Sequence, residues 1–212
     1  MAGPAAIVVR DLTGDGLIAA LDALADLRIA VFRAFPYLYD GDRAYERDYL
    51  RAYAESPGAL IVGAFDGERL VGAATAAPMI DHAAKFSEPC AAHGLDIAGV
   101  YYFGESVLLP DYRGRGIGHA FFDRREAQAR ALGFGHAAFC AVMRPGDHPA
   151  RPAGYTPLDG FWRGRGFAPV EGLVAQFDWR DVGDAGESVH AMQFWLKACD
   201  DVSALGSTSP LR

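Results

Sequence analysis

The chain has 212 residues, a hydrophobic fraction of 51%, a charged fraction of 22% and a formal net charge of −7. This length and composition are typical of one soluble globular domain that can bury its own core. The acidic balance argues against a nucleic-acid-binding protein, which would present a basic face, and it favours cationic partners.

Cysteine content and the N-terminus indicate where the protein works. Cys90, Cys140 and Cys199 are widely spaced and form no C-x-x-C pair, so neither a disulfide scaffold nor a zinc cluster is expected. The N-terminus lacks the charged and apolar regions of a signal peptide, and no apolar run approaches the roughly 18 residues that span a bilayer. We therefore expect a cytoplasmic protein without a membrane segment. Lys85 and Lys197 are the only lysines, a bias typical of a GC-rich bacterial genome.

The N-terminal quarter predicts one strand and two helices. Residues 5–10 form a short apolar run that predicts a strand. Apolar residues then recur at helical spacing and predict a helix that ends at Pro36: Leu17, Leu21, Leu24, Leu27 and Val31. A second, more polar helix is expected over residues 43–55, with Tyr45, Tyr49 and Tyr53 on one face.

A hairpin and an insertion follow. Residues 59–65 and 69–75 flank an Asp-Gly pair, the dipeptide that tight hairpin turns favour. Residues 79–98 fit no regular pattern and suggest an insertion with a short helix near residues 88–93.

The C-terminal half alternates strands and helices. A long strand is expected over residues 99–109, followed by a helix to about Leu132, where Gly133 provides a C-cap. Residues 136–143 are almost wholly apolar, as in a strand covered on both faces. A short helix over 157–165 and two strands, 167–179 and 190–197, complete the expected elements, and residues 199–212 are expected to form a flexible tail.

The turn between the long strand and the following helix has the features of an anion site. Gly114, Gly116 and Gly118 alternate with Arg115 and Ile117. Glycines let backbone N–H groups approach an anion, and the helix start adds unpaired amides and a positive dipole end. The neighbouring arginine side chains suit phosphate oxygens. The sequence therefore predicts a pyrophosphate cradle.

Two common nucleotide motifs do not fit this turn. The dinucleotide fingerprint requires G-x-G-x-x-G and an acid about 20 positions later, whereas the glycines here are spaced G-x-G-x-G and Gly133-Phe134-Gly135 stands where the acid belongs. The triphosphate loop requires a lysine, and none lies between Lys85 and Lys197.

The segment resembles motif A of the GNAT superfamily of acyl-CoA-dependent N-acetyltransferases, V-x-P-x-x-R-G-x-G-x-G/A. Six positions match, with leucine in place of the usual valine: Leu108, Pro110, Arg113, Gly114, Gly116 and Gly118. A second family signature, F/L-Y-x-x-x-G-F, is similar to residues 161–167, where Trp162 replaces the tyrosine.

The resemblance implies an α/β fold in a single domain, residues 1–198, with the family likeness running from about residue 5. We expect a central mixed sheet of six to seven strands flanked by about four helices, in the order β-α-α-β-β-β-α-β-α-β-β. The implied activity is transfer of an acetyl or other acyl group from an acyl-CoA to a primary amine of a small molecule or peptide. The alternatives are a non-catalytic acyl-CoA sensor and a protein N-acetyltransferase. No metal, nucleic acid or membrane is expected, and the protein is a monomer or homodimer.

The resemblance also assigns site residues. Acetyl-CoA is expected to contact the strand end and the turn: Val107, Leu108, Leu109, Arg113, Gly114, Arg115, Gly116, Ile117, Gly118 and His119. Glu105, the only acid in its strand, is the candidate base, and the alternative is a solvent-facing or hydrogen-bonded strand glutamate. Tyr155 is a weak candidate for the general acid. Tyr37 and Tyr39 are expected in the acceptor pocket or in ordinary core packing, and Cys140 is expected to be buried and structural.

Overall fold

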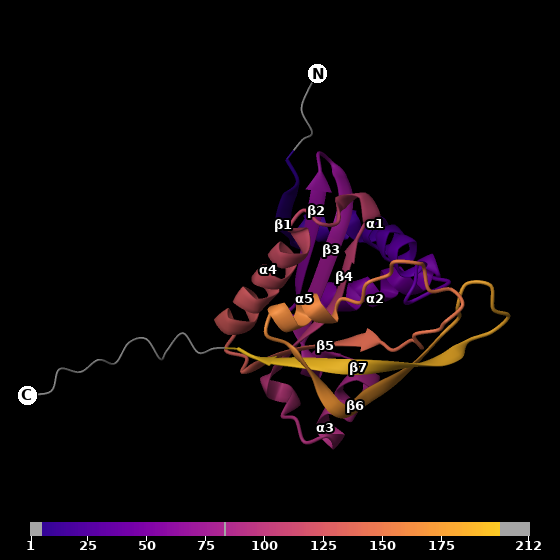
Figure 1. Ribbon diagram of the computed structural model, residues 1–212. Helices are drawn as coiled ribbons and strands as arrows, with labels where there is room; N and C mark the ends of the chain where they lie inside the picture. The colour runs from indigo at the N-terminus through magenta and orange to yellow at the C-terminus, as the bar shows by residue number, and fades with distance from the viewer. Residues whose placement is uncertain (1–5, 83, 200–212) are drawn as a thin grey trace, which may run out of the picture.

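The protein folds around one twisted sheet, as Figure 1 shows. The computed structural model describes residues 6–82 and 84–199. Its helices and strands are β1 (Val8–Leu12), α1 (Gly14–Phe32), α2 (Arg43–Glu55), β2 (Leu60–Asp66), β3 (Arg69–Pro78), α3 (Ala84–Ala92), β4 (Val100–Leu108), α4 (Ile117–Ala131), β5 (His136–Val142), α5 (Asp159–Gly164), β6 (Ala168–Trp179) and β7 (Ser188–Ala198).

The sheet has seven strands in the order β1-β2-β3-β4-β5-β7-β6. All neighbours are antiparallel except β4 and β5, which run parallel, so the sheet is mixed and the predicted fold class is confirmed. A parallel pair requires a crossover, and α4 supplies it.

Helices cover both faces of the sheet (Figure 1). α1 and α2 pack on the face that carries Ala73 and Val107, whereas α4 packs on the face that carries Val71 and Ala74. Neighbouring residues of a strand point to opposite faces, so each strand contributes to two cores. α3 packs against β6, and its Cys90 is fully buried.

The β4–β5 pair separates soon after it begins. Within the described residues, its ladder covers only Val100–Tyr102 against His136–Ala138. Beyond that point β5 continues to pair with β7 as far as Val142, while β4 continues to pair with β3. The two central strands therefore part in the middle of the sheet.

A bulge in β4 coincides with this separation. Phe103 pairs with Ala76 and Ser106 with Ala74, so β4 has one extra residue at Gly104–Glu105. A Cβ at Gly104 would collide with the hydroxyl of Tyr53, so only glycine fits there. The bulge reorients the strand at Glu105.

Arg125 of α4 anchors the bulge from the face of the sheet that α4 covers, opposite the face that α1 and α2 cover. This fully buried guanidinium donates to the carbonyl of Glu105 at 3.0 Å and to that of Thr75 at 3.3 Å. The N–H of Glu105 donates to the Thr75 hydroxyl at 3.3 Å. These bonds fix the backbone on both sides of the Glu105 side chain.

Some predicted boundaries were wrong. The first strand is β1, residues 8–12, because pairing with β2 sets its limits; position 5 lies outside the described residues, as does the predicted tail from 200 onward. The helix expected at 88–93 is the longer α3, with Pro89 inside it, and it adds a helix to the expected order. Packing against β6 holds this helix despite its proline.

The described residues form neither a membrane-spanning helix nor a cluster of metal-binding side chains. None of their helices combines the length and apolar character needed to cross a bilayer. In the same residues, no group of three or more histidine, cysteine, aspartate or glutamate side chains could hold a metal ion.

Candidate active site

A cavity of about 750 Å³ lies between α1, α2 and the part of the sheet where β4 and β5 separate. α3 and the β6–β7 hairpin contribute its remaining walls. Aromatic side chains dominate its lining: Phe32, Tyr37, Tyr39, Tyr45, Tyr49, Tyr53, Phe86, Tyr102, Phe177 and Trp179. A concave aromatic lining into which polar groups converge is typical of a small-molecule site.

The polar groups converge on Arg28 of α1. Its guanidinium forms ion pairs with Glu46 of α2 and with Glu105 of β4, and all three residues are buried. The Tyr49 hydroxyl donates to Glu105 Oε2 at 3.1 Å and lies 3.0 Å from the Tyr53 hydroxyl. We call these five residues the Arg28 cluster. They tie both N-terminal helices to the β4 bulge.

Contacts within the cluster keep Arg28 charged and Tyr49 protonated. Burial lowers the pKa of Arg28, but the attraction of the Glu105 and Glu46 carboxylates outweighs it and leaves that pKa well above its usual value. Burial, followed by the charge of Glu105, raises the pKa of Tyr49 well above its usual value. Tyr49 therefore stays protonated and can donate its hydrogen bond to the carboxylate.

His82 follows β3 and also lines the cavity. Its ring lies 4.8 Å from that of Tyr102 and 5.3 Å from that of Tyr53. Its Nε2 has no hydrogen-bond partner in the described residues. Burial lowers the pKa of His82 to about 4, so the imidazole is neutral near pH 7. A neutral imidazole can accept or donate one hydrogen bond to a bound molecule.

The sequence contained a signal for Arg28 that we did not use. Arg28 stands four residues after Leu24 and seven after Leu21, so it lies in the apolar phase of its helix. Glu46 likewise precedes Leu50 by four residues, in phase with the buried side of α2. A charged residue in an apolar phase indicates a buried ion pair, and here two such residues meet.

The glycine turn lies at the C-terminal end of β4, away from the cavity lining. Gly114 and Gly116 have φ angles of +73° and +80°, and a Cβ at either would meet nothing within 4 Å. α4 begins directly behind them, and no side chain caps its N-terminus. The turn therefore offers open space beside uncapped N–H groups, which fits a pyrophosphate.

Two arginines flank this space. Arg113 Nε donates to the Leu108 carbonyl at 3.3 Å, and Arg115 NH2 donates to the Asp111 carbonyl at 2.8 Å. Both side chains are exposed and keep further N–H groups free for an anion, since a guanidinium has five donors. Arg115 also lies over the Tyr112 ring, at 5.2 Å.

The remaining residues of the turn differ in which of their groups a ligand could contact. Ile117 is buried in the α4 core, so only its backbone faces the turn, whereas Gly118 leaves its helix surface open apart from Phe161. The exposed ring of His119 packs on Phe161 at 4.9 Å, and its Nδ1 lies 3.4 Å from Arg165.

Backbone hydrogen bonds at the end of β4 determine which of its amides could bind a ligand. The N–H of Leu109 donates to the Val71 carbonyl at 3.0 Å, so it is not available to a ligand, contrary to our expectation. Successive N–H groups of a strand point to opposite edges, which directs the amide of Leu108 toward the open edge of β4. Val107 is fully buried against α1 and α2.

Two residues lie outside the cavity lining: Tyr155, the weak candidate for the general acid, and Trp162, which stands where the family signature has tyrosine. Tyr155 packs edge-on against Phe35 at 4.7 Å, and burial raises its pKa. Trp162 contacts Phe139 and Trp195, with ring separations of 5.0 and 5.1 Å, so its half-buried indole packs against the core.

Cys140 does line the cavity. Its Sγ lies 2.9 Å from the Tyr102 hydroxyl, and burial raises the pKa of the thiol to about 12. A thiol with so high a pKa is a poor nucleophile, which agrees with a structural role.

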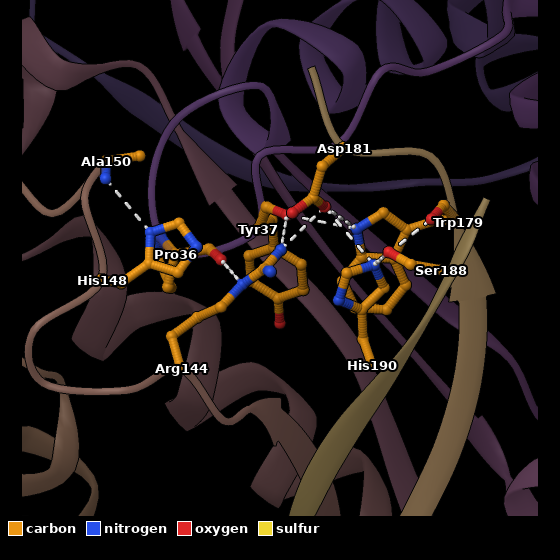
Figure 2. Close-up of polar contacts among 9 residues, drawn as sticks. All are labelled: Pro36, Tyr37, Arg144, His148, Ala150, Trp179, Asp181, Ser188 and His190. Atoms are coloured by element: carbon orange, nitrogen blue, oxygen red, sulfur yellow. Dashed lines mark hydrogen bonds and ion pairs between the residues drawn. The ribbon is translucent and has the colours of Figure 1, made fainter. Parts of the chain in front are cut away.

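Tyr37 and Tyr39 also line the cavity, from the loop between α1 and α2. Figure 2 shows what holds this loop: Arg144 and Trp179 both donate to the Tyr37 carbonyl, at 2.7 and 3.2 Å, and both also donate to Asp181. Arg144 further donates to the Pro36 carbonyl at 2.8 Å. We call Arg144, Trp179 and Asp181 the loop clasp.

Solved structures show the same fold at low sequence identity. The ribosomal-protein-alanine N-acetyltransferase from Brucella melitensis is 15% identical, with a TM-score of 0.59 over 90% of this chain and 99% of that one. A GNAT superfamily phosphinothricin acetyltransferase from Sinorhizobium meliloti, in complex with AcCoA, is 16% identical, with a TM-score of 0.57 over 97% and 94%. PaiA N-acetyltransferase from Thermoplasma acidophilum, in complex with coenzyme A, is 14% identical, with a TM-score of 0.52 over 91% and 99%.

Sequence comparison gives the family directly. No curated protein matches the chain as a relative. The family model described as Acetyltransferase (GNAT) family matches residues 22–153, which include the second half of α1, all of α2, the β4 bulge and the glycine turn. The chain therefore belongs to the GNAT acetyltransferase family, an acyltransferase family, as its sequence motifs predicted.

Proposed function

We propose that the protein transfers an acetyl group from acetyl-CoA to the primary amine of a small cationic molecule. The observation that carries this proposal is the position of Glu105. Its carboxylate lies in an aromatic cavity at the β4 bulge, where the central strands part. An acceptor in the cavity and a thioester between the strands would meet beside it.

The glycine turn and the β4 edge would hold the co-substrate. Gly114, Gly116 and the first amides of α4 would cradle the pyrophosphate, with Arg113 and Arg115 on its oxygens. The amide of Leu108 would bind the pantetheine arm along the open edge of β4. These assignments rest on the uncapped helix start, the open space at both glycines and the exposed arginines.

The charge of the cavity favours a cationic acceptor. Three basic residues line it, Arg28, Lys85 and Arg180, against seven acidic ones: Asp40, Asp42, Glu46, Asp81, Glu105, Asp178 and Glu187. Asp178 and Glu187 form no ion pair in the described residues, so they can attract an ammonium group. The aromatic walls add cation–π attraction.

Glu105 is the proposed proton acceptor, directly or through one water. An amine attacks a thioester only as the neutral base, so an ammonium acceptor must lose a proton before or during C–N bond formation. The Arg28 ion pair and the Tyr49 hydrogen bond fix the orientation of the carboxylate. The neutral His82 offers a further polar atom for the acceptor.

The shape of the site favours a small acceptor over a folded protein. The loop between α1 and α2, α3 and the β6–β7 hairpin all contribute walls to one cavity. An amine must therefore enter a recess to reach Glu105, which a small molecule or a peptide N-terminus can do.

A thiol-release assay with acetyl-CoA tests this proposal. 2-Phenylethylamine, phenylalanine and glutamate form a series of increasing negative charge on a primary amine. We expect kcat/KM for phenylethylamine to exceed that for phenylalanine by about 10-fold, equivalent to about 1.4 kcal/mol of charge preference. Turnover restricted to anionic amines would contradict the charge preference. Acetyl-CoA binding without thiol release, with any amine, would point to a sensor instead.

A further inference from the structure

Tyr37 contributes a phenol to the wall of the cavity. Tyr49, Tyr53 and Tyr102 each engage their hydroxyls with another side chain. The Tyr37 hydroxyl makes no hydrogen bond within the described part of the chain, although the rest of the residue is firmly held. Figure 2 shows its ring directed away from Asp181, with the hydroxyl at the far end.

The loop clasp accounts for this orientation. Arg144 and Trp179 hold the Tyr37 carbonyl, and Asp181 accepts from both of them at 2.8 and 3.0 Å. Arg144 and Asp181 are mostly buried, with side-chain exposures of 9% and 13%. His190 stacks on Trp179 with 3.8 Å between ring centroids and completes the support. The backbone of Tyr37 is thus held by Trp179 at the end of β6 and by Arg144 in the loop after β5, so its ring has a set direction.

That direction leads to the place where the strands part. Tyr37 lines the same cavity as Glu105 of β4 and Cys140 of β5, each of which stands just beyond the last β4–β5 pair, Tyr102–Ala138. Burial raises the pKa of the Tyr37 phenol, and the nearby Cys140 and Glu105 raise it further. The phenol therefore stays protonated and acts as a hydrogen-bond donor.

We propose that Tyr37 donates a hydrogen bond to the CoA sulfur as it leaves, with the loop clasp positioning it. This inference rests on the proposed acetyl transfer. The amine nitrogen forms a bond to the carbonyl carbon, the C–S bond breaks, and its electron pair goes to sulfur. The proton lost by the amine passes to Glu105 or water and ends on the sulfur as the thiol, so the Tyr37 phenol is unchanged. Trp162 packs against the core outside the cavity lining and takes no part in this step.

Replacement of Tyr37 by phenylalanine tests the hydrogen bond. A bond to a charged sulfur contributes about 1.5–3 kcal/mol, so Tyr37→Phe should lower kcat by about 10- to 100-fold. The acetyl-CoA Kd and the KM for the amine should stay near those of the wild type, because the ring remains. Tyr101→Phe is the matched control: its hydroxyl donates to the Gly58 carbonyl and the residue lies outside the cavity lining, so kcat should stay within about two-fold.

A double-mutant cycle tests the positioning role of the clasp. Asp181→Asn alone should lower kcat, but in the Tyr37→Phe background it should cause no further loss, because it acts through the Tyr37 hydroxyl. Arg144→Lys, which loses the paired bonds to the two carbonyls, should behave in the same way and replaces Asp181→Asn if that variant does not fold. Effects that multiply would overturn the positioning role.

The outcomes separate this inference from the function it rests on. A wild-type protein that turns over amines, together with a Tyr37→Phe variant of unchanged kcat, would overturn the inference and leave acetyl transfer standing. A wild-type protein that binds acetyl-CoA but releases no thiol would overturn the proposed function, and the inference with it.

Discussion

Arg28 of α1 and Glu105 of β4 form a buried ion pair beside the β4 bulge. The pair holds a carboxylate in the wall of an aromatic cavity, where an isolated charge would be costly to bury. Arg28 also binds Glu46, so it serves two carboxylates, and one of them lies where the central strands part. The stability of the Arg28 cluster and the chemistry of Glu105 are therefore linked.

This link sets the expected result of Glu105→Gln. Loss of one partner of a buried ion pair costs about 3 kcal/mol, so the free energy of unfolding should fall measurably. The rate should fall by much more, with kcat/KM lower by about 100- to 10,000-fold, because glutamine cannot accept the amine proton. Acetyl-CoA affinity should stay near that of the wild type. Denaturant unfolding, calorimetry and steady-state kinetics measure these three quantities.

Glu46→Gln is the matched control for that experiment. It removes the other carboxylate from Arg28 and should cost similar stability, but its rate loss should be far smaller. If the two variants lose kcat/KM equally, Glu105 acts only through the integrity of the cluster. Full activity of Glu105→Gln across pH would assign proton removal to another group or to water.

The second prediction concerns the pyrophosphate. Arg113→Gln and Arg115→Gln should each weaken CoA binding by about 10-fold, as expected for loss of one charge-assisted hydrogen bond. Both should leave the affinity for S-acetyl-pantetheine, which lacks the pyrophosphate, unchanged. A valine at Gly116 is a less clean test, because φ is +80° there and any side chain strains the backbone. Isothermal titration with both ligands measures the difference.

Arg163→Gln is the control for the loss of an arginine. Residues 163–166 repeat the Arg-Gly-Arg-Gly sequence of the turn, but Arg163 lies over Trp195 at 5.2 Å. Its replacement should not alter CoA affinity. Equal loss for CoA and S-acetyl-pantetheine in the Arg113 or Arg115 variants would place the pyrophosphate elsewhere.

The fold could be predicted because its signals are local. Apolar runs and the Asp-Gly turn predicted the seven strands of the described residues, helical spacing predicted the first helix, and the proline–arginine–glycine pattern predicted the turn before α4. The insertion helix was placed too late and too short, because packing against β6, a long-range contact, holds it. Boundaries set by tertiary packing have no local signature.

The site was only partly predictable for the same reason. Glu105 was recognised as an isolated acid in an apolar strand, and Tyr37 and Tyr39 as loop aromatics. Their partners come from far along the chain: Arg28 and Glu46 from two helices, and Arg144 and Asp181 from loops that meet only in the fold. Similarly, only the register with β3 reveals that the Leu109 amide is already bonded.

The last prediction concerns pH and His82. Burial holds the pKa of His82 at about 4, below its ordinary value of 6.5. Between these values the unfolded chain takes up a proton that the folded protein does not, so protonation favours unfolding. The contribution of a neutral His82 is fully present above pH 6.5 and is lost as the pH falls toward 4, by up to about 3 kcal/mol over the window.

His82→Phe keeps a ring among its aromatic neighbours and removes this titration. Its free energy of unfolding should therefore decline less steeply than that of the wild type between pH 6.5 and 4.5, as denaturant unfolding at several pH values would measure. His136→Gln removes an exposed imidazole and controls for the loss of a histidine as such. Parallel curves for His82→Phe and the wild type would show that His82 is protonated in the folded protein as readily as in the unfolded chain.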